Sequence, residues 1–431
     1  MEVKAGYKQT EVGVIPEDWG VVTAAEACTK IQDGTHFSPR SGGSDYRYVT
    51  SKNVRFGSLD LSTAGWIDAT QHQSIYRRCD VRKGDLLLTK DGANTGNAAL
   101  NSLAEEFSLL SSVAFLRFNS SKYSAAYFLQ QVLAWQGQSQ IQNAMAGNAI
   151  TRLTLEKINK LRFPVPPTKS EQEAIAQALS DADSHIESLE RLLAKKRQLK
   201  QGVMQELIGA MKRLPGFNGA ERRTTELGQL PSDWKVAAIG LIAQVKTGPF
   251  GSSLHERDYV GDGTPIITVE HLGENSIVHA NVPMVSDVDR ARLNAYSLED
   301  GDIVFSRVGS VDRNALVTVA ESGWLFSGRL LRVRASPDVV DAKYLSYHFH
   351  SEPFKQRVRT VAVGQTMASL NTQILKGVLV ALPPLPEQMA IAGILRDVDA
   401  ELAALHWELA KARGLKQGMM QELLTGSLRL V

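Results

Sequence analysis

The sequence predicts an α+β protein with a pseudo-two-fold internal duplication. Two mixed α/β domains are joined by two long antiparallel coiled-coil helices. Three observations support this prediction. The same segments return in the same order about 216 residues later. A proline pair precedes a long helical pattern of apolar residues in each copy. The charge along these patterns reverses sign, which favours antiparallel pairing.

The duplication is clearest at the two ends of each copy. Residues 10–19 return as 225–234, and both runs end in Asp-Trp. Residues 199–207, Leu-Lys-Gln-Gly-Val-Met-Gln-Glu-Leu, return almost unchanged as 415–423. The intervening sequence, such as residues 35–80, has almost no counterpart. A period this long indicates a duplicated domain, because solenoid units run about 20–50 residues. One scaffold with two divergent surfaces suggests two related tasks on two targets.

The repeat predicts four segments, two heads and two long helices. The heads span 1–165 and 214–382, and the helices occupy 166–213 and 383–431. Each head reads as mixed α/β. The predicted strands include 86–88, 113–116, 303–305 and 330–333, and the predicted helices are 123–142 and 343–358.

The long helices have clear start and seam signals. The pairs at 166–167 and 383–384 are Pro-Pro, which ends whatever precedes them. Ser170–Glu173 is a capping-box pattern. Apolar residues then recur from Ile175 to Leu193 at alternating spacings of four and three, which is typical of a coiled-coil seam.

Charge predicts how these helices pair. The stretch from Glu171 to Glu190 holds six acids and no base, and Arg191–Lys200 holds five bases and no acid. The second copy repeats this pattern more weakly. An antiparallel arrangement places each acidic half beside a basic half. The alternatives are solvated faces or contacts with another subunit.

Composition excludes several classes. The chain has 431 residues, a formal charge of +2, 43% hydrophobic residues and 22% charged residues, as in ordinary globular proteins. Two cysteines cannot make a disulfide framework and fit a reducing compartment. No run approaches 18 apolar residues, and the polar N-terminus is not a secretory signal. We therefore expect a cytoplasmic protein.

Motifs for catalysis are missing from the sequence. There is no G-x-x-x-x-G-K-[ST] loop, no G-x-G-x-x-G, and no Asn/Asp-Pro-Pro-aromatic motif for amino-methylation. Residues 337–343 faintly resemble a nuclease triad, and helix capping is the favoured interpretation. His348 and His350 lack clustered partners, which favours a half-buried helix face over a metal site. Cys28 and Cys79 are predicted core residues. The sequence predicts no enzyme, no metal and no cofactor.

Taken together, the motifs resemble the specificity (S) subunit of type I restriction–modification systems. The resemblance covers nearly the whole chain. It rests on the Pro-Pro then Glu-Gln entry to each helix, the duplicated Leu-Lys-Gln-Gly endings, the Asp-Trp starts, and Gly-Pro-Phe-Gly-Ser at 248–252.

The resemblance implies two target-recognition domains, each reading one half of a split, asymmetric sequence in double-stranded DNA. It implies that the helices space the halves and bind two methyltransferase (M) subunits, with restriction (R) subunits joining the complex. S-adenosylmethionine would bind the M subunit, and ATP and magnesium the R subunit, leaving no cofactor in this chain.

Glycine-containing loops are the predicted DNA contacts, because loops bring short polar side chains to a ligand over a rigid fold. Arg and Lys suit guanine edges, and Asn and Gln suit adenine edges. The alternative is ordinary turn chemistry. The candidates in the first head are Thr35, His36, Arg40, Lys90, Asn94, Thr95, Asn148, Thr151 and Arg152. Those in the second head are Ser252, Ser253, His255, Arg307, Ser310, Arg313, Gln365 and Thr366.

The net charge of each head restricts the predicted DNA contacts, and two further residue pairs are not expected to contact DNA. Residues 1–169 carry 19 bases and 15 acids, whereas 214–386 carry 17 bases and 18 acids, so DNA contacts must be local patches. Arg332 and Arg334 share one strand face, which could line the DNA-binding groove or be solvated, and solvation is the expected outcome. Trp19 and Trp234 are expected to be packing anchors.

Other functions remain open. Within the family, the chain fits a methylation-only subunit or one of several exchangeable variants. Outside it, two divergent heads on a helical rod could bind proteins as a scaffold. A self-sufficient nuclease is disfavoured by the missing motifs.

Overall fold

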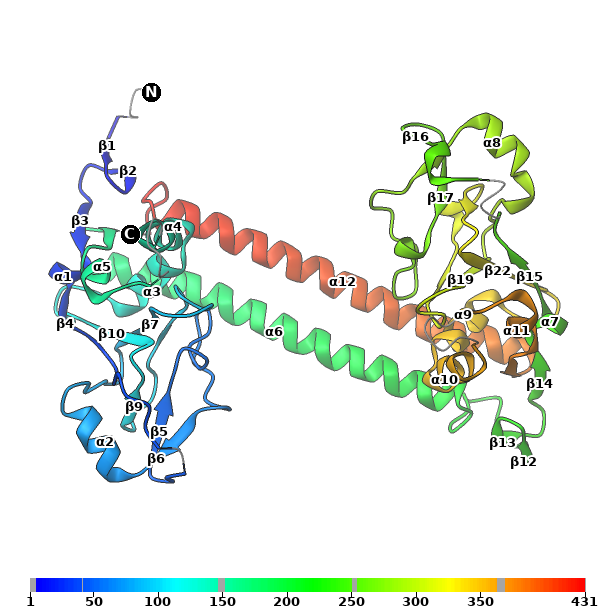
Figure 1. The fold of residues 1–431 in the computed structure, drawn as a ribbon, viewed down its shortest axis with the longest axis horizontal. Helices are drawn as coiled ribbons and strands as arrows, with labels where there is room; N and C mark the ends of the chain where they lie inside the picture. Colours follow the sequence, from blue (N-terminus) through cyan, green and yellow to red (C-terminus); the bar gives the residue numbers. More distant parts are fainter. Residues whose placement is uncertain (1–4, 41, 146–151, 250–253, 363–368, 431) are drawn as a thin grey trace. The chain divides into compact units, whose positions relative to one another are not determined.

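The computed structural model describes residues 5–40, 42–145, 152–249, 254–362 and 369–430. The chain divides into two compact units (Figure 1). The first unit combines Met1–Arg191 with Trp407–Val431, and the second is Leu192–His406. Each unit therefore holds one head and part of both long helices.

The first head is built on an antiparallel sheet whose strands lie in the order β4-β10-β7-β8. Leu86, Leu87 and Leu88 are wholly buried, which explains the continuous apolar run in β7. The strands are β4 (Cys28–Asp33), β10 (Val113–Phe118), β7 (Leu86–Thr89) and β8 (Ala98–Leu100).

Smaller elements complete this head. They are a hairpin of β1 (Tyr7–Thr10) and β2 (Gly13–Pro16), a pair of β3 (Gly20–Thr23) and β11 (Arg162–Val165), a sheet of β6 (Gly65–Ile67), β5 (Tyr46–Val49) and β9 (Phe107–Leu109), and the helices α1 (Ala24–Ala27), α2 (Ala69–Tyr76) and α5 (Leu155–Asn159).

The second head repeats this framework. Its main sheet has the order β15-β22-β19-β20, with the same antiparallel pairing. The strands are β15 (Ala243–Thr247), β22 (Leu330–Ala335), β19 (Ile303–Ser306) and β20 (Asn314–Leu316). The predicted strands at 86–88, 113–116, 303–305 and 330–333 are thus confirmed.

The smaller elements of the second head differ more from those of the first head than the two main sheets differ from each other. They are a hairpin of β12 (Arg222–Thr225) and β13 (Gly228–Pro231), a pair of β14 (Lys235–Ala238) and β23 (Leu379–Leu382), a sheet of β16 (Tyr259–Val260), β18 (Met284–Val285), β17 (Thr264–Ile267) and β21 (Leu325–Phe326), the helices α7 (Ile239–Ile242), α8 (Asp287–Arg292) and α11 (Thr372–Gly377), and the short turns η1 (Glu256–Asp258), η2 (Val269–His271), η3 (Asn294–Tyr296) and η4 (Val319–Glu321).

Each predicted single helix in the heads is two helices. The first is α3 (Ala125–Leu133) followed by α4 (Trp135–Met145), and the second is α9 (Ala342–His350) followed by α10 (Glu352–Val361). Ala134 and Ser351 adopt extended backbone at the junctions, and a proline fits the first turn of α10. In the second head Pro353 is a sequence signal for this break, because proline is unfavourable in a helix interior and fits the first turn of a new helix.

The long helices are α6 (Lys169–Ile208) and α12 (Leu385–Leu423). Thr168, not Ser170, caps α6, because its hydroxyl accepts a hydrogen bond from the Glu171 amide at 3.2 Å. The predicted capping box at 170–173 is therefore wrong by two residues. The Glu171 carboxylate instead binds Arg429.

The two helices pair antiparallel, as the charge pattern predicts. In the first unit Asp183 binds Lys416 and Glu190 binds Arg413. In the second unit Lys196 binds Glu401, and Lys200 binds Asp399 at 2.7 Å. In both units the partner number on α12 falls as the number on α6 rises.

The Glu-Gln motif at each helix start binds the helix to its head. The Gln172 and Gln388 side chains accept hydrogen bonds from the Ser124 and Asp341 amides, at 3.0 and 2.9 Å. These amides belong to the N-caps of α3 and α9. Asp341 caps α9 with its own carboxylate, so the capping interpretation of residues 337–343 is confirmed.

The glutamate of each motif is buried in an arginine clamp. In the second unit Arg213 binds Glu387 at 2.6 Å and Asp233 at 2.8 Å, and Trp234 Nε1 donates to Glu387 at 3.1 Å. Hydrogen bonds to Glu387 hold the pKa of Arg213 above its usual range.

The first unit has the equivalent clamp. Arg429 binds Glu171 at 2.8 Å and Asp18 at 3.1 Å. Trp19 and Trp234 are both buried, so their predicted role as packing anchors is confirmed. Each clamp joins the end of one long helix, the start of the other and the start of a head.

A second duplicated ion pair explains the Gly-Asp turns. Arg117 binds Asp85 through two nitrogens at 3.0 and 2.8 Å, and Arg334 binds Asp302 in the same way at 2.8 and 2.7 Å. Arg332 is buried and donates to the Ser297 carbonyl. The expectation of a solvated Arg332–Arg334 face is therefore wrong. Arg117 and Arg334 pair with acids from the turns that precede β7 and β19, which sequence order did not reveal.

Within the part of the chain that the structure describes, no helix has both the length and the apolarity needed to cross a membrane.

Replacing Arg213 with Met should destabilise the protein by about 3 kcal/mol, because it leaves the wholly buried Glu387 carboxylate without its cation. Urea unfolding measures the loss. Arg396→Met is the matched control, since Arg396 is exposed and its ion pair among the described residues is with its neighbour Asp397; it should change stability by less than about 0.5 kcal/mol. Equal effects of the two substitutions would show that the clamp is not a main source of stability.

Gly426 follows α12 with φ +72°, and an added Cβ would lie 2.6 Å from Pro16 and 3.0 Å from Trp19. Gly426→Ala should therefore destabilise the protein by about 2 kcal/mol. Gly414→Ala, in the middle of α12 with nothing within 4 Å, should raise stability by up to about 1 kcal/mol. The urea midpoint should fall for Gly426→Ala and rise for Gly414→Ala. An unchanged midpoint for Gly426→Ala would contradict the tight contact.

Candidate nucleic-acid interface

Three of the predicted loop regions of each head meet at one end of its main sheet. The loop after β4 comes first. Gly34 donates to the Val113 carbonyl at 3.2 Å, and an added Cβ would lie 2.0 Å from the Leu109 carbonyl. In the second head Gly248 donates to Leu330, and its Cβ would lie 2.1 Å from the Ser327 carbonyl. Only glycine permits this backbone contact, and it fixes the first loop against the segment that leads into β10 or β22.

The other two loops join through matching backbone bonds. Leu153 donates to the Lys90 carbonyl at 3.0 Å in the first head. Leu370 donates to the Arg307 carbonyl at 2.8 Å in the second. The segment before α5 or α11 is therefore held against the loop after β7 or β19. The framework of the loop end is the same in both heads, whereas the side chains differ.

In the first head this end contains a buried ion pair. Lys90 and Asp33 lie 3.2 Å apart, and each side chain is only 4% exposed. His36, which is exposed, lies 3.4 Å from the same carboxylate. Lys90 thus contacts protein, and the predicted role as a direct DNA contact does not fit its burial in this conformation. Its ammonium instead supports the loop that carries Thr35 and His36.

The exposed residues of the first head lie around this pair. Arg152 binds Asp91 at 2.6 Å and remains about half exposed. Asn94 and Thr95 are half-buried in the turn between β7 and β8, where Thr95 donates to the Gly92 carbonyl at 2.7 Å. Arg40 is exposed, and its backbone is held by the Gln71 amide.

In the second head the equivalent turn carries Arg307, Ser310 and Arg313. Ser310 and Arg313 are exposed, and Arg307 is half-buried. The Arg313 guanidinium donates to the Leu272 carbonyl. In the first head the corresponding hydrogen bond comes from the Asn97 side-chain amide, which donates to the Val54 carbonyl at 3.1 Å. One N–H group of Arg313 therefore holds the fold together, and the other groups of its guanidinium remain for a ligand.

His255 is exposed, and its backbone amide binds Asp258 at 2.7 Å. The remaining predicted contacts lie outside the described residues: Asn148, Thr151, Ser252, Ser253, Gln365 and Thr366.

Sequence reasoning missed two exposed cations at the loop ends. The Arg329 carbonyl accepts a hydrogen bond from the Arg307 amide at 2.9 Å, and the run Ser327-Gly328-Arg329 is itself a glycine loop that could have been found. Lys52 follows Ser51, whose amide donates to the Ser112 hydroxyl at 3.2 Å. No sequence signal pointed to Lys52, because it is brought to this end by tertiary contacts.

The two cysteine thiols and the one serine that lies beside a histidine and a glutamate are not available as nucleophiles. Burial raises the pKa of Cys28 and of Cys79 to about 12, so both thiols are protonated at neutral pH. His72 lies 3.0 Å from the Ser108 hydroxyl and 3.2 Å from Glu106, a triad-like arrangement. However, Ser108 is wholly buried, so no substrate can reach its hydroxyl. The described part of the chain holds no group of three or more metal-ligating side chains.

Of the two histidines of α9, His348 is buried and His350 is half-buried. Burial lowers the pKa of His348 to about 3 and that of His350 to about 4. Both His348 ring nitrogens are buried without a hydrogen-bond partner among the described residues. The equivalent residue of the first head is Gln131, which donates to Tyr127 at 2.6 Å and to the Leu424 carbonyl at 3.1 Å.

Acid should therefore destabilise the protein through His348. The unfolded chain takes up a proton near pH 6.5 and the folded chain only near pH 3, so stability falls by up to about 1.4 kcal/mol for each pH unit between these values. His348→Gln should remove that share of the slope in urea unfolding between pH 7 and 5. His185→Gln, at an exposed position on α6, should keep the wild-type slope. An unchanged slope for His348→Gln would show that this burial has no pH consequence.

The two heads share one framework and carry different loop side chains. The model described as "Type I restriction modification DNA specificity domain" matches residues 16–198 and 231–411. The chain therefore belongs to the type I restriction–modification specificity family, and it contains the DNA specificity domain twice.

Relatives and solved structures agree with this assignment. The chain is 24% identical over 439 residues to a putative type I restriction enzyme MjaX specificity subunit of Methanocaldococcus jannaschii, covering 98% of this chain and 97% of the relative. It is 20% identical to the EcoKI specificity subunit of Escherichia coli, covering 96% and 90%. The crystal structure of the type I S subunit from M. genitalium matches with a TM-score of 0.60 at 14% identity, over 98% of both chains.

Proposed function

We propose that this chain is the DNA-recognition subunit of a type I restriction–modification complex and that each head reads one half of a bipartite, asymmetric target. The observation that carries the proposal is the loop end of the main sheet. The same backbone bonds build it in both heads, at Leu153 to Lys90 and at Leu370 to Arg307, while the side chains it presents differ. A conserved frame with different side chains suits two different half-sites.

Exposed and half-buried residues of these loops are the proposed DNA contacts. In the first head they are His36, Arg40, Asn94, Thr95 and Arg152, with Thr35 beside them. In the second head they are His255, Arg307, Ser310 and Arg313. The predicted residues at 148, 151, 252–253 and 365–366 stay part of this proposal. Lys90 becomes a positioning residue, because it is paired with Asp33 inside the head.

Exposed residues that are identical in both copies support two binding sites for one partner. Leu199 and Leu415 are half-exposed or more, and Gly202 and Gly418 have nothing within 4 Å of an added Cβ. Solvation alone does not require an apolar residue at these positions. We assign this face to two methyltransferase subunits, to which restriction subunits add the nuclease activity.

Catalysis belongs to these partners in the proposal. S-adenosylmethionine would bind the methyltransferase subunit, and ATP and magnesium the restriction subunit. This chain would hold no cofactor of its own and would act in the cytoplasm, where the DNA is.

Mapping modified bases across the source genome, with this gene present and deleted, tests the proposed function. Loss of methylation at one split motif on deletion is the expected result. Unchanged methylation together with no co-purifying methyltransferase would overturn it. In that case, salt-independent binding to proteins rather than DNA would support the scaffold alternative.

Replacing residues 225–382 with the second head of another family member should change only one half of the methylated motif. The reason is that each head has its own core and its own loop end. The matched exchange of residues 10–165 should change only the other half. A change in both halves after either exchange would contradict independent reading, and methylation mapping distinguishes the outcomes.

A further inference from the structure

Positive charge gathers in the first head around the turn that follows α2. The Asp80 carboxylate in this turn binds Lys30 of β4 at 2.5 Å and Arg117 of β10 at 3.1 Å. It also binds Arg82 at 2.9 Å, and Asp85 binds Arg117 at 2.8 Å. Further bases stand in the same turn. We define the basic surface by six residues: Lys30, Arg77, Arg78, Arg82, Lys83 and Arg117.

The acids of this region do not balance its bases. The six bases share two carboxylates, those of Asp80 and Asp85. Glu106, which binds His72 of α2 at 3.2 Å, is a third acid nearby and still leaves three positive charges in excess. Three bases of the surface are exposed, and their side chains have no ion pair or hydrogen bond with the residues that the structure describes: Arg77, Arg78 and Lys83. These charges are available to a ligand.

The second head has balanced charges at the equivalent place. At the offset of 217 residues, two bases of the turn become neutral and two become acidic. The equivalents of Arg77, Arg78, Arg82 and Lys83 are Asn294, Ala295, Glu299 and Asp300. Three bases of β15 and β22 remain beside three acids, and each donates to a group of the segment 294–302. These bases are Lys246, Arg332 and Arg334. The excess of positive charge therefore belongs to the first copy.

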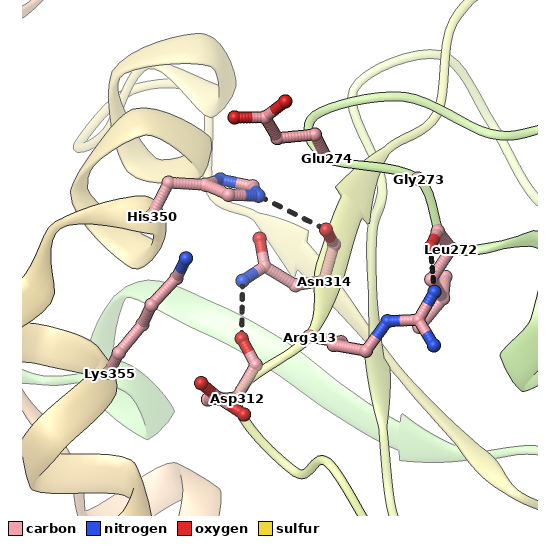
Figure 2. Close-up of a pocket in the computed structure, with 8 residues that line it drawn as sticks. All are labelled: Leu272, Gly273, Glu274, Asp312, Arg313, Asn314, His350 and Lys355. Carbon is pink, nitrogen blue, oxygen red and sulfur yellow. Dashed lines mark hydrogen bonds between the residues drawn. The ribbon is translucent and has the colours of Figure 1, made fainter. Parts of the chain in front are cut away.

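The cavity of about 390 Å³ in the second head does not supply a comparable excess. Two bases and two acids are among the residues that line it (Figure 2). They are Arg313, Lys355, Glu274 and Asp312. The cavity is therefore balanced in charge, unlike the basic surface of the first head.

Helix α2 joins the basic surface to the loop end of the first head (Figure 1). Near the start of α2, the Gln71 side chain accepts a hydrogen bond from the Arg40 amide at 2.8 Å and donates to the Arg40 carbonyl at 3.3 Å. Arg77 is the C-cap of the same helix. The helix rises about 9 Å from Gln71 to Arg77, at about 1.5 Å per residue. The basic surface thus begins about three base-pair steps of about 3.4 Å from a proposed DNA contact.

A protein partner shared by both heads does not explain the basic surface. Two copies of one subunit would use equivalent positions of the two heads, and these positions carry opposite charges, as at Arg82 and Glu299. DNA phosphates are the anions that the proposed function already brings to this head. Lysine and arginine bind them whatever the base sequence.

We propose that the basic surface binds the phosphate backbone of the DNA next to the half-site read by the first head, and that the second head makes no equivalent contact. The inference rests on the proposed function. Exposed bases beside a duplex release counterions and add affinity without reading the sequence. The complex is therefore expected to hold the DNA over a longer stretch at the first half-site than at the second.

The double variant Arg78→Gln with Lys83→Gln tests the proposal, because neither side chain has a partner whose loss would disturb the fold. The complex with its methyltransferase is titrated with a duplex that carries the motif methylated by the wild type. We expect about tenfold weaker binding at moderate salt and a salt slope smaller by about 2. The methylated motif should not change. Lys343→Gln with Lys376→Gln, at exposed positions of the second head, removes the same charge and should bind as the wild type does.

Two outcomes separate the failure of this inference from the failure of the proposed function. Specific binding by the wild type, with an unchanged affinity and salt slope for the double variant, overturns the backbone contact and leaves the function intact. No specific binding by the wild-type complex overturns the function, and this inference with it.

Neutral methylphosphonate linkages, placed one at a time in the duplex, locate the contact. The wild type should lose affinity at adjacent linkages beside the first half-site, which the exchange of residues 10–165 identifies, and the double variant should no longer respond to them. Equal responses of both proteins at every linkage overturn the proposal. An acidic protein is the other possible partner. If the double variant co-purifies with less methyltransferase or restriction subunit but binds DNA normally once assembled, the surface is a protein contact and the proposal is wrong.

Discussion

The arginine clamp at each end of the helix pair is the contact on which the rest of the structure depends. Glu171 and Glu387 are almost wholly buried, and a buried carboxylate is tolerated only when a cation and hydrogen bonds compensate for lost hydration. Arg429 and Arg213 supply the cation and also reach Asp18 and Asp233. One charge therefore fixes three segments: the entry to one helix, the end of the other and the first strands of a head. The neighbouring Gln172 and Gln388 extend this control to α3 and α9.

Because this frame is rigid, the side chains at the loop end of each head can differ without changing the fold. The loops are held by backbone contacts, at Gly34 and Gly248 and at the carbonyls of Lys90 and Arg307, so their side chains do not have to be the same. The two heads use this freedom differently. The first buries Lys90 against Asp33 and keeps Arg152 beside Asp91. The second uses Arg313 to bind the Leu272 carbonyl and opens a charged pocket next to it.

Because the heads are duplicated, each unusual residue of one copy can be compared with the equivalent residue of the other copy. His348 replaces Gln131, and Lys355 replaces Gln138, so the second head exchanges two satisfied amides for an unpartnered buried imidazole and a cation without a counter-ion among the described residues. Ala210, with φ +54°, stands where the first unit has Gly426 at φ +72°. These differences carry a cost in stability that the shared frame does not need.

The sequence by itself determined the duplication, the framework strands, the helix pair and its antiparallel direction. These features depend on the repeat period, the pattern of apolar residues and the order of charges, and all three can be read directly from the sequence. It also pointed to the loops, because glycine marks places where backbone approaches backbone. Only the tertiary structure decided which cations face outward. Lys90 and Arg332 look like surface bases in the sequence and are buried, whereas Lys52 gave no sequence signal and is exposed at the loop end. The reason is that the partners of a charge, such as Asp33 for Lys90, come from segments far away in the chain.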